Sequence, residues 1–96
     1  MTSRYLIPCR IERSAFSTER LFTIGLSSGE KTFAGYYEHF LDGNKRPLEL
    51  NTPKKGEVLE GFAKCRIIQR QEDGSLIIDI PSSDSLLVQP DVLVEV

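Results

Sequence analysis

The chain is 96 residues long; 40% of it is hydrophobic, 27% is charged, and the formal net charge at pH 7 is −2. This length predicts one domain, residues 1–96, and the composition excludes a disordered chain. The charge balance gives little reason to expect a polyanionic partner.

The N-terminus and the cysteines indicate a cytoplasmic protein without a membrane span. Residues 1–4 have no apolar signal-peptide core, and no apolar run reaches the length of about 18 residues that a membrane span needs. Cys9 and Cys65 are too few for a disulfide framework and too far apart for a CxxC motif. We therefore expect two reduced, partly buried thiols.

Residues 5–13 predict the first strand, because apolar and polar side chains alternate along them. One face comprises Tyr5, Ile7, Cys9 and Ile11, and the other comprises Leu6, Pro8, Arg10 and Glu12. Proline has no N–H to donate to a ladder, so the strand should have an edge or a bulge at Pro8. Residues 14–18 form a connection in which we expect Phe16 to fold inward as an anchor.

Two further strands follow, at residues 19–27 and from residue 30 to about residue 41. The inward face of the first of them comprises Phe22, Ile24 and Leu26. A tight turn at Ser28-Gly29 would place Phe22 opposite Gly35. A glycine in the middle of a strand indicates a bulge or a close approach by another backbone, and we expect one of these at Gly35.

Residues 42–55 predict a polar loop. It opens on Asp42-Gly43-Asn44, which is a strong turn signal, and it contains two prolines and four basic residues. Leu48 and Leu50 are the exception, since their spacing predicts a short strand within the loop.

A β-hairpin is predicted for strands at residues 58–71 and 75–81. Asp73-Gly74 between two alternating runs is typical of a two-residue turn, because such a turn needs positive φ. This turn would place Ile67 opposite Ile80. The predicted core face comprises Ala63, Cys65, Ile67, Leu76, Ile78 and Ile80. The predicted outer face comprises Lys64, Arg66, Ile68, Arg70, Ile77 and Asp79.

The C-terminal segment resembles the close of an SH3-like barrel. A turn at residues 81–84 leads into a short strand at residues 86–89, and residues 92–96 close the fold. Residues 87–94 (LVQPDVLV) are similar to the proline-led single turn of 3₁₀ helix that precedes the last strand of SH3-like barrels. The peptide-binding aromatic pattern of true SH3 domains is not evident, so the resemblance does not imply a proline-rich ligand.

Short strands separated by turns, without a convincing helical period, predict an all-β domain. The fold class that we expect is a small SH3-like β-barrel of five to seven mostly antiparallel strands. The alternative is an OB-like barrel. Residues 55–62 (KGEVLEGF) resemble the opening of the RNA-binding oligonucleotide barrels of ribosomal proteins, where a G-[DE]-x-[VL]-x-G pattern starts the first strand.

The residues do not combine into a catalytic, metal or cofactor site, so we expect a protein that is not an enzyme and needs no cofactor. Residues 25–32 (GLSSGEKT) nearly match the phosphate loop G-x-x-x-x-G-K-[ST], but Glu30 replaces the second glycine and would repel phosphate. His39 is the only histidine, and the sequence names no partner for it in general-base chemistry. Cys9 and Cys65 lie mid-strand among apolar neighbours, where a thiol is inert.

Two surfaces remain as candidates for binding. Apolar residues on the presumed outer faces favour a protein partner or a homo-oligomer; they are Leu21, Tyr36, Ile68 and Ile77, with Leu21 expected opposite Tyr36. Basic residues with nearby tyrosines as stacking surfaces leave RNA or single-stranded nucleic acid as the alternative; this site comprises Lys64, Arg66, Arg70, Tyr36 and Tyr37. The leading hypothesis is a binding module or accessory subunit that acts through protein–protein contacts.

Overall fold

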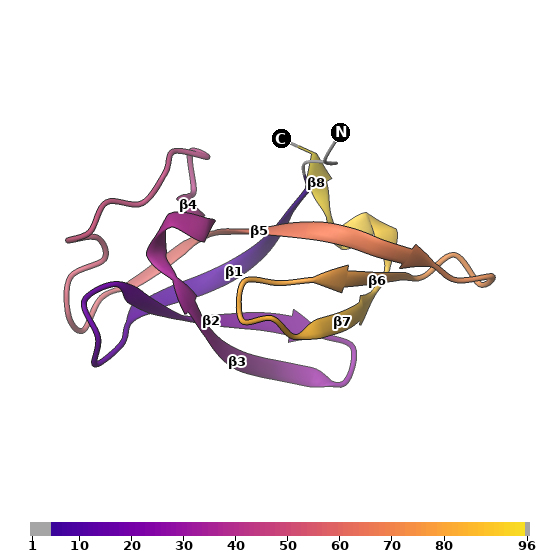
Figure 1. Cartoon of the computed structure of the whole chain (residues 1–96), viewed down its shortest axis with the longest axis horizontal. Helices are drawn as coiled ribbons and strands as arrows, with labels where there is room; N and C mark the ends of the chain where they lie inside the picture. Colours follow the sequence, from indigo (N-terminus) through magenta and orange to yellow (C-terminus); the bar gives the residue numbers. More distant parts are fainter. Residues whose placement is uncertain (1–4, 96) are drawn as a thin grey trace.

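An antiparallel sheet that curls into a half-barrel forms the body of the molecule (Figure 1). The computed structural model describes residues 5–95. Its strands are β1 (Tyr5–Arg13), β2 (Glu19–Leu26), β3 (Gly29–Tyr36), β4 (Phe40–Asp42), β5 (Val58–Arg70), β6 (Leu76–Asp79), β7 (Ser85–Val88) and β8 (Val94–Glu95). Two single turns of 3₁₀ helix are η1 (Tyr37–His39) and η2 (Pro90–Val92). The strand order is β3-β2-β1-β5-β6-β7, with β4 paired to β5 and β8 paired to β1.

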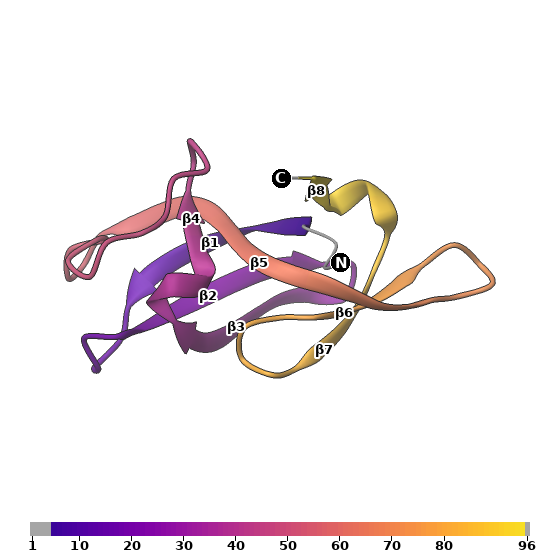
Figure 2. The ribbon, with the colours of Figure 1, turned by 45° about the horizontal axis from the view of Figure 1, so that its top comes forward.

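The long strand β5 joins the two halves of the sheet. Its first part, residues 58–65, pairs with β1, and its last part, residues 66–70, pairs with β6. Figure 2 shows β5 crossing the molecule as a single bent ribbon, so the two halves face different directions. The prediction of an all-β domain is confirmed, and the described residues form eight strands rather than five to seven.

The strand predicted from residue 30 to about residue 41 is interrupted by η1. β3 ends its pairing with β2 at Tyr36, and β4 starts its pairing with β5 at Phe40. The chain therefore changes partners within three residues, and the Tyr37 N–H donates to the Thr18 carbonyl (2.8 Å) as it turns. This change of partner accounts for the additional strand.

The loop at residues 43–57 contains no strand, so the short strand predicted at Leu48 and Leu50 is wrong. Leu48 is buried in the core, whereas Leu50 is about half exposed. The turn that opens the loop is confirmed. The Asp42 carboxylate accepts hydrogen bonds from the backbone N–H groups of Asn44 (2.8 Å) and Arg46 (3.0 Å).

The edge that Pro8 requires is confirmed in β1. β5 lies along one side of this strand, while the other side is shared: β2 pairs with residues 10–13 and β8 pairs with residues 5–6. Pro8 lies in the gap between these two partners, where no ladder needs its missing N–H.

The loop of the β5–β6 hairpin has three residues, 72–74, rather than the predicted two. The Gln71 N–H donates to the Ser75 carbonyl (2.8 Å), and Gly74 takes a left-handed conformation with φ 92°. The Asp73 carboxylate accepts hydrogen bonds from the N–H (2.9 Å) and hydroxyl (2.6 Å) of Ser75. These bonds lower the pKa of Asp73 and favour the wider loop.

A bulge at Ile68 adds a second offset to this hairpin. Ile67 pairs with Ile78 instead of with Ile80, and the next pair is Gln69 with Ile77. The longer loop and the bulge each shift the register by one residue. Because side chains alternate with a period of two, the combined shift keeps Ile67 and Ile78 on the predicted core face. Arg70 lies beyond the bulge and pairs with the inward Leu76, so its predicted place on the outer face is wrong.

The β2–β3 hairpin is also shifted by two residues. Its loop is Ser27-Ser28, one residue earlier than predicted, so Phe22 lies opposite Phe33 rather than Gly35. Gly29 directly after the turn has φ 117°, a conformation that L side chains rarely adopt. The inward face of β2 is as predicted, because the shift is even.

The inward faces of the strands meet in one apolar core. Its buried members are Ile7, Cys9, Ile11, Phe22, Ile24, Phe40, Leu48, Ala63, Cys65, Leu76, Ile78, Ile80, Leu86 and Val88. The ring centroid of Phe22 is 4.9 Å from that of Phe40 and 5.5 Å from that of Phe33. Burial of each large aliphatic or aromatic side chain contributes about 1.5–3 kcal/mol.

Gly35 marks a contact that brings the end of β3 against the β6–β7 turn. A Cβ on Gly35 would lie 2.9 Å from the Cβ and 3.4 Å from the carbonyl carbon of Pro81. The close approach predicted at this glycine is therefore confirmed, and any larger residue would push the two segments apart.

Phe16 is not the inward anchor that was predicted, because its side chain is 68% exposed. The Glu19 N–H donates to the Phe16 carbonyl (3.2 Å), and the Phe16 N–H donates to the Ser14 hydroxyl (3.0 Å). These bonds close a tight turn between β1 and β2, which carries the ring on its outside.

Arg20 is a buried cation at the base of β2, with 0% of its surface exposed. Its Nε donates to the carbonyl of Thr52 (3.0 Å), Nη1 to those of Ser17 (2.8 Å) and Glu19 (2.9 Å), and Nη2 to those of Leu50 (2.7 Å) and Glu49 (3.3 Å). Burial lowers the pKa of Arg20, and the nearby Arg13 lowers it further. One guanidinium thus fastens the loop at residues 43–57 to β2.

Candidate binding surfaces

The predicted basic site is split along β5. Lys64 and Arg66 are two residues apart on the outer face, whereas Arg70 lies at the far end of the strand, beyond the bulge at Ile68. The Arg66 guanidinium is 2.9 Å from the carboxylate of Asp79 on β6, and this ion pair offsets its charge. The three basic residues therefore do not form one uniform positive strip.

The predicted stacking residues lie where β3 passes into η1. The ring centroids of Tyr36 and Tyr37 are 5.0 Å apart, and that of Tyr36 is 6.2 Å from that of His39. Tyr36 is 44% exposed, whereas the Tyr37 ring lies 5.5 Å from the guanidinium carbon of the buried Arg20. Of the two tyrosines, Tyr36 is the one whose ring is presented to solvent.

A shallow hollow of about 620 Å³ connects part of this predicted site. It is lined by His39, Lys64, Cys65, Arg66, Asp79, Ile80, Pro81 and Ser83. Because Phe40 pairs with Ala63, His39 lies beside Lys64 at the start of the hollow. The structure therefore brings Lys64 and Arg66 near Tyr36 by way of His39, and it leaves Arg70 and Tyr37 outside.

The apolar surface predicted around Leu21 and Tyr36 does not form. Leu21 is half-buried and pairs with Ala34, while Tyr36 pairs with Glu19 two residues further along β3. The predicted pairing was wrong because it assumed the β2–β3 register that the earlier turn shifts.

A second apolar surface does form, on the outer face of β5, β6 and β7. Ile77 pairs with Leu87, and the bulge sets Ile68 and Gln69 together opposite Ile77. Leu87 is 63% exposed and Ile68 is 51% exposed, with the half-buried Ile77 between their strands. We call Ile68, Ile77 and Leu87 the outer apolar patch.

The exposed position of Leu87 was not predicted from the sequence. Residues 86–89 predict a strand, but the faces of so short a run cannot be assigned without knowing its partner. The pairing with β6 turns Leu86 inward and Leu87 outward. The alternation Leu86, Leu87, Val88 is the only sequence signal, because it requires one apolar side chain to face solvent.

The outer apolar patch borders a broad, shallow hollow of about 850 Å³ and the edge of the sheet. Ile77 and Leu87 line this hollow together with Ser85, Arg70 and the loop between β5 and β6. β7 is the last strand of the sheet order, so within residues 5–95 no strand pairs with its outer side. Apolar side chains and unpaired backbone groups therefore occur together here.

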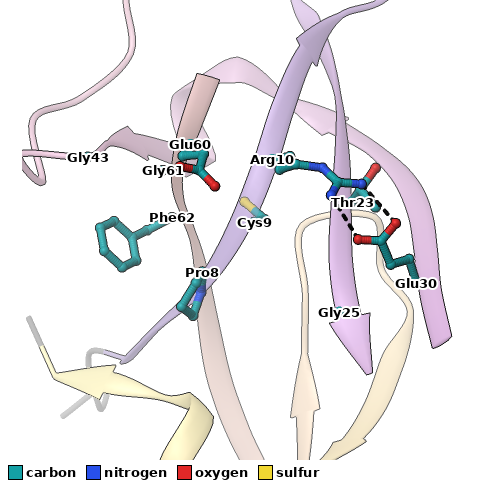
Figure 3. A pocket seen from close by; sticks show the side chains of 10 residues that line it. All are labelled: Pro8, Cys9, Arg10, Thr23, Gly25, Glu30, Gly43, Glu60, Gly61 and Phe62. Atoms are coloured by element: carbon teal, nitrogen blue, oxygen red, sulfur yellow. Dashed lines mark hydrogen bonds and ion pairs between the residues drawn. The ribbon is translucent and has the colours of Figure 1, made fainter. Parts of the chain in front are cut away.

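A third depression, of about 420 Å³, lies where β1 and β2 diverge (Figure 3). Arg10 of β1 reaches past Thr23 of β2 to Glu30 of β3, with nitrogen–oxygen distances of 2.8 and 2.9 Å. The hydrogen bond from Arg10 lowers the pKa of Glu30. Residues 25–32 thus form a hairpin with Glu30 held in an ion pair, and they do not form a phosphate loop.

The two thiols are buried in the core, whereas the histidine is exposed. Burial raises the pKa of Cys9 to about 12 and that of Cys65 to about 11, so both are protonated at neutral pH. His39 is exposed, and its ring packs near Tyr36. Among residues 5–95, no three His, Cys, Asp or Glu side chains cluster closely enough to hold a metal ion.

The helices of residues 5–95 are the single 3₁₀ turns η1 and η2. No helix among these residues is long and apolar enough to cross a membrane.

Comparison of the chain with protein-family models, with curated proteins and with solved structures found no match.

Proposed function

We propose that this protein is a non-catalytic binding module or accessory subunit that acts through protein–protein contacts. The observation that carries the proposal is the outer apolar patch beside the open edge of β7. Its two most exposed members, Leu87 and Ile68, are large aliphatic side chains that a lone domain gains nothing by presenting to water. A partner surface would cover the patch and pair with the strand edge at once.

An SH3-like arrangement is the barrel type that we favour. Three features support it: β1 lies between β5 and the terminal β8, β5–β6–β7 form consecutive hairpins, and the proline-led turn η2 precedes β8. The last feature was expected from the resemblance of residues 87–94 to the close of SH3-like barrels. We also place the protein in the cytoplasm, since its two cysteines are unpaired and buried in the core.

Affinity capture with two matched variants tests the protein–protein proposal. Leu87→Ser removes the most exposed member of the outer apolar patch, and Phe16→Ser removes a side chain of similar exposure on a distant turn. We expect wild type and Phe16→Ser to retain the same specific partner, identified by mass spectrometry, and Leu87→Ser to lose it. Equal retention by all three proteins would contradict a role for the patch.

RNA or single-stranded nucleic acid is the second candidate ligand. Its support is the hollow lined by Lys64, Arg66 and His39, because the exposed ring of Tyr36 packs near His39. The ion pair of Arg66 with Asp79 weighs against it. Filter binding across a salt series decides the matter: phosphate contacts must weaken as salt rises, and Lys64→Glu must weaken them further than Lys31→Glu on β3.

A further inference from the structure

The two edges of the sheet differ in how they are protected. β3, at one edge, carries Glu30 and Lys31 and contains Gly29 and Gly35, all of which discourage pairing with another strand. β7, at the other edge, reads Ser-Leu-Leu-Val and continues into Gln89, with no charge, proline or glycine. Natural sheets seldom leave such an edge open unless something pairs with it.

The backbone groups of β7 that point outward can be assigned from the turn that precedes it. The Ile80 N–H donates to the Asp84 carbonyl (3.1 Å), so this closing pair is hydrogen-bonded. Hydrogen-bonded pairs alternate along an antiparallel ladder, so Leu86 and Val88 bond to β6. The N–H and C=O groups of Ser85 and Leu87 therefore point away from the sheet.

We propose that the β7 edge pairs antiparallel with β7 of a second copy, about a two-fold axis at Leu87. This inference rests on the proposed function and names the partner of that surface. In this register Leu87 lies opposite the partner's Leu87, and both residues have outward N–H and C=O groups to exchange. Leu86 lies opposite the partner's Val88, so the inward faces of the two sheets also coincide.

The side chains on the outer face match in the same register. The outer apolar patch of one copy continues directly into that of the other, through two adjacent leucines whose solvent exposure would fall. Ser85 lies opposite the partner's Gln89, and Asp84 lies opposite the partner's Pro90, so like charges do not meet. A two-fold interface must be self-complementary in this way, because each surface meets its own copy.

Sedimentation velocity of the full chain over micromolar to millimolar concentrations tests the association. We expect a monomer–dimer equilibrium in the wild type. Leu87→Lys would set two ammonium groups against each other at the axis and raise the dissociation constant by about tenfold or more. Phe16→Lys is the control, since it adds the same charge at a residue of similar exposure and should leave the equilibrium unchanged.

Amide hydrogen exchange by NMR tests the register. The Leu87 and Ser85 amides should become protected as the protein concentration rises, whereas the Leu86 and Val88 amides, already bonded to β6, should not change. If Leu87→Lys unfolds the protein, Ser85→Lys serves in its place, because it changes an exposed residue on the same edge. We expect Ser85→Lys to abolish the concentration-dependent protection of the Leu87 amide.

Two outcomes would overturn the pairing: a monomer at every concentration, or a dimer in which exchange at Leu87 does not depend on concentration. Neither outcome would contradict the proposed protein–protein function. If the Leu87→Ser variant failed to capture a partner other than its own copy, the patch would still be a binding surface. Equal capture by wild type and Leu87→Ser, together with a strict monomer, would refute both.

Discussion

The loop at residues 43–57 and the outer edge of β7 both present backbone groups that strands leave unpaired, and the chain treats them in opposite ways. In the loop and the turn beside it, five carbonyls converge on the guanidinium of Arg20, which is fully buried. At the edge, the outward groups of Ser85 and Leu87 meet solvent in the isolated chain. The chain thus closes an irregular loop with one charged side chain and leaves the outer side of a regular strand unpaired.

Substitution of Arg20 has the largest expected effect on stability. Arg20→Ala leaves five carbonyls without their donor, and we expect the free energy of unfolding to fall by at least about 3 kcal/mol. For a chain of this size, that loss lowers the melting temperature by on the order of 15 °C. Urea titration and thermal melts followed by circular dichroism provide the measurement.

Arg20→Lys and Arg10→Ala are the matched controls for this experiment. Lysine keeps the charge but has three donors in a different geometry, so it should recover only a small part of the loss. Arg10 is exposed in its ion pair with Glu30, so its removal should leave stability nearly unchanged. If Arg20→Ala were as stable as Arg10→Ala, the loop would be held by something other than the guanidinium.

The second test concerns β4, the short strand from which this loop departs. A Cβ on Gly61 of β5 would clash with the carbonyl oxygen of Leu41 on β4. Gly61→Ala must displace β4 and the start of the loop, at a cost of about 1–3 kcal/mol. Gly25→Ala is the control, because a Cβ on Gly25 meets nothing within 4 Å. Equal stability of the two variants would show that β4 moves freely on β5.

The third test uses the two thiols, which are members of the apolar core. Their pKa values, about 12 for Cys9 and about 11 for Cys65, exceed the ordinary value of 9.0. Above pH 9 the unfolded chain loses thiol protons that the folded chain keeps, so stability must fall as pH rises. The loss per thiol is about 1 kcal/mol at pH 10.

Alkaline unfolding of Cys9→Ala and wild type isolates this contribution. Tyrosines and lysines titrate equally in both proteins, so the difference in their slopes between pH 8 and pH 10 reports Cys9. Parallel slopes, or rapid alkylation of Cys9 in the folded protein at pH 8, would mean that water reaches the core at this point.

Strand alternation predicted the faces of this molecule better than its registers. Both hairpins are offset by two residues from the predicted pairing, and an even offset leaves Ile67 and Phe22 on their predicted sides. The pattern of apolar residues determines that parity, but the loop length and the bulge at Ile68 determine the offset. Neither has a strong signal in the composition of the strands.

Arg20 and Leu87 were not predicted, for related reasons. Arg20 occupies an inward position of β2, yet a charge on a strand is ordinarily assigned to solvent, and the carbonyls it needs come from residues 17–19 and 49–52. Leu87 occupies an outward position, yet a leucine is ordinarily assigned to the core. In both cases the contacts that decide the matter come from segments distant in the sequence.

The smallest expected effect is that of Leu87→Ser on the stability of the monomer, which should stay within about 0.5 kcal/mol of wild type. The side chain is 63% exposed and its backbone bonds point outward, so its loss opens no cavity and strands no buried group. Urea titration at the lowest workable protein concentration measures this change in the free energy of unfolding. We expect it to be far smaller than the change in Arg20→Ala. A loss above 1 kcal/mol would instead assign Leu87 to the core of its own chain, and the apolar patch would then need no partner to explain it.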